Sequence, residues 1–276
     1  YGILVAGTDN RITNSGSIEV VGSGAGVRWR GTGNSLVNSG TISGAQFGVL
    51  AATGTTDSTI ENQGSITGSH TCVSATAATG STNLTSSGLM DCGATAVQLG
   101  SGDDLVALVD GSATIGDIDL GDGTDSVVLD VGDGLAGRLD GSILAAEALH
   151  KDGAGLFTIN GDAEVGFSSA HVNAGTLQLM NGTLTGNTYV GAGATLAAFQ
   201  YAFSGDVENA GTLVSGDGLL AIDGDFTQGA DGSLQLYSNL AGTDSSRIEA
   251  TGAAILDGHV DVTLTDPANL LLGYND

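Results

Sequence analysis

A phrase repeated every 24 residues is the feature that most constrains how this chain folds. Four copies of an Asn-x-Gly-x-Ile pattern, the last one degenerate, place their glycines at Gly16, Gly40, Gly64 and Gly88. Two apolar columns share this step: Ile12, Leu36, Ile60 and Leu84, and Val49, Val73 and Val97. A period this long exceeds one helix or one strand, and it fits one coil of a solenoid built from short strands and turns.

Stacked coils predict a role for each column. Apolar residues of successive coils should lie about 4.8 Å apart in the interior. Asn14, Asn38 and Asn62 are expected to form an amide ladder at a corner, and the glycines are expected to take the positive-φ position of that turn. We therefore favour a structural role over a binding role for the asparagine column.

The second half of the chain keeps the strand phrases but loosens the period. The step falls to 21 residues between Asp104 and Asp125. Composition agrees with many short strands and tight turns, because 47 of the 276 residues are Gly, one is Pro and 4% are aromatic. We predict an all-β chain that forms a single right-handed parallel β-helix of about a dozen coils, roughly 50–60 Å long.

The charge balance limits the possible partners. The net charge is −25, with only six Lys and Arg residues. Nucleic acid and anionic membranes are improbable partners, because both are bound through clustered cations.

Residues 103–140 hold much of this negative charge and allow two interpretations. One is a weak calcium site, because the phrases there resemble calcium-binding repeats; the candidates are Asp103, Asp104, Asp122 and Asp125. The other, which we favour, is a solvated acidic face, because the nine-residue calcium repeat is missing. Stacking of Asp104 over Asp125 would need a cation or hydrogen-bond donors between the carboxylates.

The two cysteines, Cys72 and Cys92, stand 20 residues apart, slightly less than one coil. They should therefore lie on adjacent coils near one corner. Export to an oxidising compartment would favour a disulfide over two free thiols.

Two segments are candidates for outward contacts. In the first, Trp29 should point into the core and Arg28 and Arg30 should point outward together, because side chains alternate along a strand. The second is a pair of turns one coil apart, with candidate contact residues Thr53, Thr55, Asp57, Thr79 and Thr82.

Catalytic signatures are missing from the sequence. There is no Gly-x-Ser-x-Gly motif, and the histidines are far apart in sequence: His70, His150, His171 and His259. We expect the chain not to be an enzyme and to need no cofactor, calcium excepted.

Several phrases in the second half resemble autotransporter passengers. Residues 149–161 (LHKDGAGLFTING) and 172–177 (VNAGTL) are similar to the passenger-associated repeat, roughly L-x-K-x-G-x-G-x-L-T-L-x-G followed by V-x-A-G-T-L. Lys151 and Gly153 match it, whereas Phe157 and Ile159 depart conservatively. The pertactin-like region beside the membrane barrel is similar to residues 207–213 (VENAGTL), 224–228 (GDFTQ), 231–234 (DGSL), 244–248 (DSSRI) and 251–258 (TGAAILDG).

This resemblance implies a division of the chain and a location. Residues 1–148 would be passenger coils, and residues 149–276 a cap that acts as an autochaperone. The passenger would cross the periplasm and outer membrane of a Gram-negative bacterium through its own C-terminal β-barrel translocator, which this chain lacks. It would then stand at the cell surface or be secreted.

Two functions fit these observations. The first is an adhesin that binds other copies of itself or a host surface. The second is an inert stalk that presents an enzyme domain, a protease or an esterase, encoded upstream.

Overall fold

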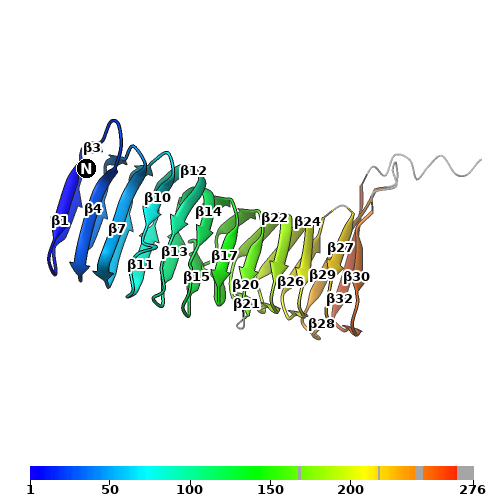
Figure 1. Ribbon diagram of the computed structural model, residues 1–276. Helices are drawn as coiled ribbons and strands as arrows, with labels where there is room; N and C mark the ends of the chain where they lie inside the picture. The colour runs from blue at the N-terminus through cyan, green and yellow to red at the C-terminus, as the bar shows by residue number, and fades with distance from the viewer. Residues whose placement is uncertain (167–168, 217, 240–244, 266–276) are drawn as a thin grey trace, which may run out of the picture.

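The computed structural model describes residues 1–166, 169–216, 218–239 and 245–265. Throughout these residues every regular element is a β-strand, and the strands stack into one elongated solenoid (Figure 1). This confirms the predicted all-β parallel β-helix. Asp244 and residues 266–276, which belong to the predicted cap, lie outside the described residues.

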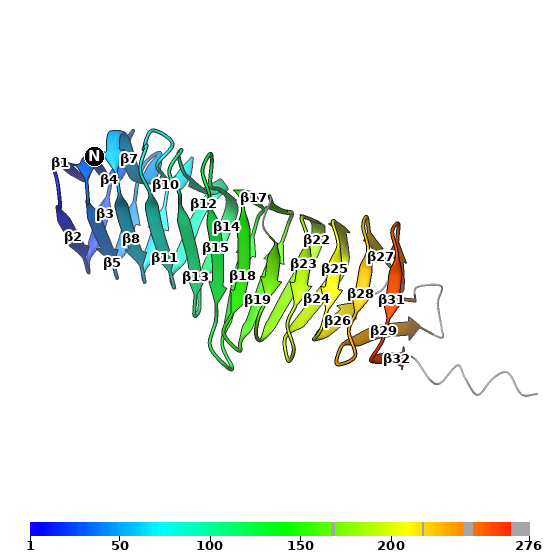
Figure 2. The same ribbon diagram turned by 90° about the horizontal axis from the view of Figure 1, so that it is seen from below.

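Each coil contributes a strand to three faces. Face I is the 12-stranded sheet, with one strand from each of twelve coils (Figure 2). Its strands are β2 (Arg11–Asn14), β5 (Ser35–Asn38), β8 (Ser58–Asn62), β11 (Thr82–Ser86), β13 (Leu105–Val109), β15 (Ser126–Asp130), β18 (Ala148–Asp152), β21 (Ala170–Val172), β23 (Thr188–Val190), β25 (Val207–Asn209), β28 (Phe226–Gln228) and β31 (Ala254–Leu256).

The 20-stranded sheet supplies the other two faces. Face II follows face I along the chain and holds β3 (Ser17–Glu19), β6 (Thr41–Ser43), β9 (Ser65–Thr67), β16 (Ala136–Asp140), β19 (Leu156–Asn160), β26 (Thr212–Ser215), β29 (Ser233–Asn239) and β32 (His259–Thr265). Face III holds β1 (Ile3–Ala6), β4 (Ala25–Thr32), β7 (Phe47–Thr56), β10 (Thr71–Ser74), β17 (Ile143–Ala146), β20 (Ala163–Val165), β27 (Leu219–Ile222) and β30 (Arg247–Ala250). Four longer strands cross from face II to face III: β12 (Leu89–Gln98), β14 (Ala113–Asp119), β22 (Thr176–Thr185) and β24 (Thr195–Ser204).

All ladders between named strands are parallel and connect equivalent positions of successive coils. On face I one inward column runs Ile12, Leu36, Ile60, Leu84, Val106, Val127, Leu149, Ala170, Thr188, Val207, Phe226 and Ala254. The first three steps are the predicted 24 residues, and the later steps shorten to between 18 and 22 before a last step of 28. Shorter coils are possible because the corners absorb the change while the strands stay in register.

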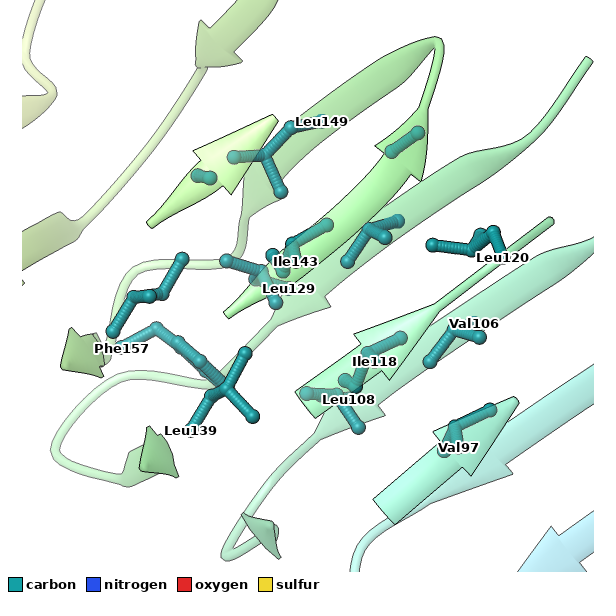
Figure 3. Close-up of a cluster of buried hydrophobic side chains, with 14 of the residues drawn as sticks. Val97, Val106, Leu108, Ile118, Leu120, Leu129, Leu139, Ile143, Leu149 and Phe157 are labelled. Carbon is teal, nitrogen blue, oxygen red and sulfur yellow. The ribbon is translucent and has the colours of Figure 1, made fainter. Parts of the chain in front are cut away.

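The interior is a narrow apolar column. Figure 3 shows side chains of faces I, II and III meeting there, among them Val106, Leu129, Ile143 and Phe157. The face I ladder crosses the predicted domain boundary between residues 148 and 149 without a break, because β18 pairs with both β15 and β21. The chain is therefore one continuous solenoid, as predicted.

The last described coil lies open on its far side. Its inward residues Leu256, Val260 and Val262 are 58%, 50% and 56% exposed, whereas the residues beneath them are mostly buried. The capping role assigned to residues 149–276 stays a prediction.

The glycines of the 24-residue phrase have a different role from the predicted one. Gly16, Gly40, Gly64 and Gly88 do not adopt positive φ. Instead, a Cβ at Gly40 would collide with the carbonyl oxygen of Gly16, and the same holds for each later pair. Glycine is required there because successive corners approach backbone to backbone.

Candidate functional site

The asparagine column lies at the end of face I and is structural. The Nδ2 of Asn14 donates to the Oδ1 of Asn38 at 2.8 Å, and that of Asn38 donates to Asn62 at 2.9 Å. Each amide also donates to a backbone carbonyl of the next coil, for example Asn38 to Ser65. The column thus satisfies buried corner carbonyls, as the sequence predicts.

Lys151 occupies this same column three coils after Ser86, in register with Leu129 and Val172. Its side chain is fully buried, and the Nζ donates to the carbonyls of Asp152, Gly153 and Ala174 at 2.6, 2.8 and 3.1 Å. Burial lowers the pKa of the ammonium, while the nearby carboxylates of Asp130 and Asp152 act against this. Its three donors replace the asparagine amide at a wider corner.

The opposite corner of face I carries an acidic column. The backbone N–H of Thr82 donates to Asp104 Oδ1 at 2.5 Å, that of Asp104 to Asp125 Oδ1 at 2.7 Å, and that of Asp125 to Glu147 Oε2 at 2.6 Å. Asp104 and Asp125 are buried, and their Oδ2 atoms meet no hydrogen-bond partner among the described residues. Burial raises the pKa of each carboxyl to about 6, helped by the neighbouring carboxylates.

The predicted stacking of Asp104 over Asp125 is therefore present, with backbone donors between the carboxylates. The other calcium candidates do not join them. Asp103 and Asp122 are exposed, and Asp103 Oδ1 accepts the N–H of Thr124. Within the described ranges no group of three or more His, Cys, Asp and Glu side chains is arranged to hold a metal ion.

Other carboxylates of the acidic segment have a use that neither sequence interpretation included. Asp110 accepts the N–H of Gly132, and Asp117 accepts that of Ser142. Outside the segment, Asp162 accepts the N–H of Thr183. Each bond joins one coil to the next at a turn. Some of the carboxylates therefore accept hydrogen bonds from backbone N–H groups and do not only face water.

The segment around Trp29 lies as predicted on β4. Trp29 is fully buried, and its indole N–H donates to the Oγ of Ser58 at 3.1 Å. Arg30 is exposed, and the guanidinium of half-buried Arg28 lies 4.9 Å from the ring centre of Tyr1. Arg30 is thus free at the surface, whereas Arg28 is partly engaged.

The two threonine-rich turns require a correction. Thr53, Asp57 and Thr79 are exposed as expected. Thr55 and Thr82, however, are buried, and the Thr55 hydroxyl donates to the carbonyl of Ala52 at 2.6 Å. The alternation changes within β7, which turns Thr55 inward, whereas Thr82 begins β11 and points inward in regular alternation with Leu84 and Ser86. Neither side chain belongs to a contact surface.

Cys72 and Cys92 lie on adjacent coils and form a disulfide, with their Cα atoms 5.4 Å apart. Both residues are buried. The bond joins β10 to β12 beside the interior.

Two histidines that are distant in sequence come together. His150 of β18 and His171 of β21 are in register and stack with ring centres 5.5 Å apart, and the His171 ring lies 5.8 Å from that of Tyr189 on β23. The distance between the histidines in the sequence gave no indication of this pair. The missed signal was the 21-residue step that also relates Leu149 to Ala170.

No family model, curated protein or solved structure matches this chain. None of the described residues forms a helix long and apolar enough to span a membrane. The candidate sites above therefore rest on the geometry alone.

Proposed function

We propose that this chain is an autotransporter passenger, displayed at the surface of a Gram-negative bacterium, and that it acts as a non-enzymatic adhesin. Two things support the proposal: a parallel solenoid of twelve coils, and the passenger-like phrases that occur in order along its second half. Export through the periplasm and a C-terminal translocator barrel belong to the same proposal, as does an autochaperone role for residues 149–276.

The observation that carries the adhesin proposal is the unbroken register of the outward columns. On face I, equivalent positions recur in register at every coil, about 4.8 Å apart. Such a surface suits a partner that is also repetitive, because many weak contacts then add without a deep pocket. Self-association of neighbouring passengers and attachment to a host surface both fit this description.

The test for self-association is cell settling. Cells that display the wild type should clump, and Arg28→Glu/Arg30→Glu should clump less, because the arginines would face the acidic surface of a neighbour. Each exposed charge pair contributes only about 0–1 kcal/mol, so the effect should weaken further in high salt. Wild-type cells that stay dispersed would reject self-association, and clumping unchanged by the double substitution would reject this charged contact alone.

A stalk that presents an upstream protease or esterase domain is the second candidate. The observation that favours it is the continuous ladder, which makes a stiff spacer roughly 50–60 Å long. The sequence of the full precursor discriminates the two functions, since a stalk requires a catalytic domain before residue 1.

A further inference from the structure

One outward column of face I changes character in the middle of the solenoid. Ala107, Val128, His150, His171 and Tyr189 lie in register on five successive strands, β13 to β23. We call these five residues the stripe. Face I strands lie side by side along the solenoid (Figure 2), so the stripe runs parallel to its long axis for about 19 Å.

The rest of the same column is mostly polar. Thr13, Val37, Glu61 and Thr85 precede the stripe, and Glu208, Thr227 and Ile255 follow it. All five stripe residues are half-buried, so part of each apolar or aromatic side chain faces solvent. Half-buried Leu105 and Val109 widen it on β13. Solvent-facing strands normally carry polar residues at such positions, so apolar or aromatic side chains on five successive coils point to a contact surface.

The rim of the stripe is acidic. Asp130 and Asp152 stand in register in the next outward column, and Glu208 ends the stripe beside Tyr189. A surface hollow next to His171 and Tyr189 is also lined by Asp206 and Glu208. Among the face I strands from β13 to β25 the only Lys or Arg is Lys151, whose ammonium is held inside by three carbonyls.

The acidic rim disfavours several possible binding partners of the stripe. A second copy of the chain would bring its own acidic rim against this one, which costs energy for a molecule of net charge −25. Anionic glycans and anionic lipid surfaces meet the same repulsion. A segment that alternates cationic and apolar side chains complements both the stripe and its acidic rim. Its apolar side chains cover the stripe while its cations reach the rim.

We infer that the stripe is a docking surface for an extended, cationic peptide segment of a partner protein. At about 3.3 Å per residue, six to eight residues cover its length. The inference rests on the proposed adhesin function, for which it names the surface and the chemistry of the partner.

Purified chain and defined peptides test the inference. The probes are eight-residue peptides of alternating lysine and leucine, of alternating glutamate and leucine, and of alternating lysine and serine. The lysine–leucine peptide should bind best, the lysine–serine peptide at least about tenfold more weakly, and the glutamate–leucine peptide not measurably. Equal binding of the glutamate–leucine peptide would overturn the proposed partner.

The main variant is Val128→Thr/His171→Thr/Tyr189→Thr, because threonine already occupies this column at Thr13, Thr85 and Thr227. It should bind the lysine–leucine peptide at least about tenfold more weakly than the wild type.

The matched control is Leu89→Thr/Ile115→Thr, on the outward side of face II, where the same two columns hold Thr41 and Thr67. It should bind like the wild type, and equal loss in both variants would overturn the inference. A rim variant, Asp130→Asn/Glu208→Gln, tests the charge with all apolar side chains retained, and unchanged affinity there would contradict the cationic partner.

Two further readouts separate this inference from the proposed function. Sedimentation should give the same result for the wild type and the stripe variant, whereas a dimer that the stripe variant abolishes would assign the surface to a second copy instead. On cells, adhesion that the stripe variant leaves unchanged would overturn the stripe and retain the adhesin. Peptide binding by the purified chain without adhesion of cells would retain the stripe and remove the adhesin.

Discussion

The buried pair of Asp104 and Asp125 makes the stability of this solenoid depend on pH in an unusual direction. Both carboxyls have a pKa raised to about 6 in the folded chain, against an ordinary value of 3.8. Because the folded state holds these protons more tightly, stability is greatest at low pH and is lost as pH rises through about 6. Most surface carboxylates contribute with the opposite sign.

The size of the effect follows from the two pKa values. Moving from pH 7 to pH 4.5 should raise the free energy of unfolding by about 2 kcal/mol per carboxyl, and by less than twice that for the pair, because part of the raised pKa of Asp104 comes from the charge of Asp125. The Asp104→Asn/Asp125→Asn variant should lack this increment and should be more stable than the wild type at pH 7. The same corner supports the substitution, since Asn34 Oδ1 accepts the N–H of Asn10 at 3.1 Å.

The assay is urea unfolding followed by circular dichroism at pH 7 and pH 4.5. The difference between variant and wild type is the quantity of interest, because contributions common to both proteins cancel in it. Asp103→Asn, an exposed neighbour, is the control and should leave the difference near zero. A variant that is less stable than the wild type at pH 7, or a difference that does not change with pH, would refute the reasoning.

Three further predictions concern the corners and the disulfide. The unfolded, unreduced chain should show no titratable thiol, and reducing the bond between Cys72 and Cys92 should cost about 3 kcal/mol for a 20-residue loop, measured by urea unfolding. Lys151→Met should lower the free energy of unfolding by about 3 kcal/mol in the same assay, because three partly buried corner carbonyls lose their donor. Gly40→Ala should lower the free energy of unfolding by about 1–3 kcal/mol. Gly16→Ala should leave it unchanged, because there is open space around Gly16; thermal unfolding measures both.

The first four coils were predictable because their corners have constant length. Ile12, Leu36, Ile60 and Leu84 stack as their spacing indicates, and so do the asparagines. A fixed period converts sequence position directly into spatial position. The alternation of side chains along a strand then assigned Trp29 to the core. The prediction weakened at positions such as Thr55, where a strand runs into a corner and the alternation of side chains changes.

Beyond about residue 100 the coil length varies, and sequence position no longer gives the register. The 21-residue step revealed Asp104 over Asp125, yet the same reasoning was not extended to His150 over His171. Lys151 was noticed only for its resemblance to a passenger motif. Its place in the asparagine column could be recognised only from the structure of the corner between β18 and β19. A long side chain and a short one can occupy the same column where the corners differ in width.

A regular solenoid makes departures from regularity informative. Every coil could repeat the same residues, so a column that changes does so for a reason other than the fold. In the coils from β13 onward two columns of face I change together: the corner shifts from Asn34 and Thr82 to Asp104 and Asp125, and the outward column shifts from Thr85 to apolar and aromatic residues. The corner change is accounted for by backbone donors. The outward change adds the ring contacts of His150, His171 and Tyr189, but it also leaves half-buried apolar surface that threonine would not present. That asymmetry is what assigns the stripe, and not the acidic corner, to contact with a partner.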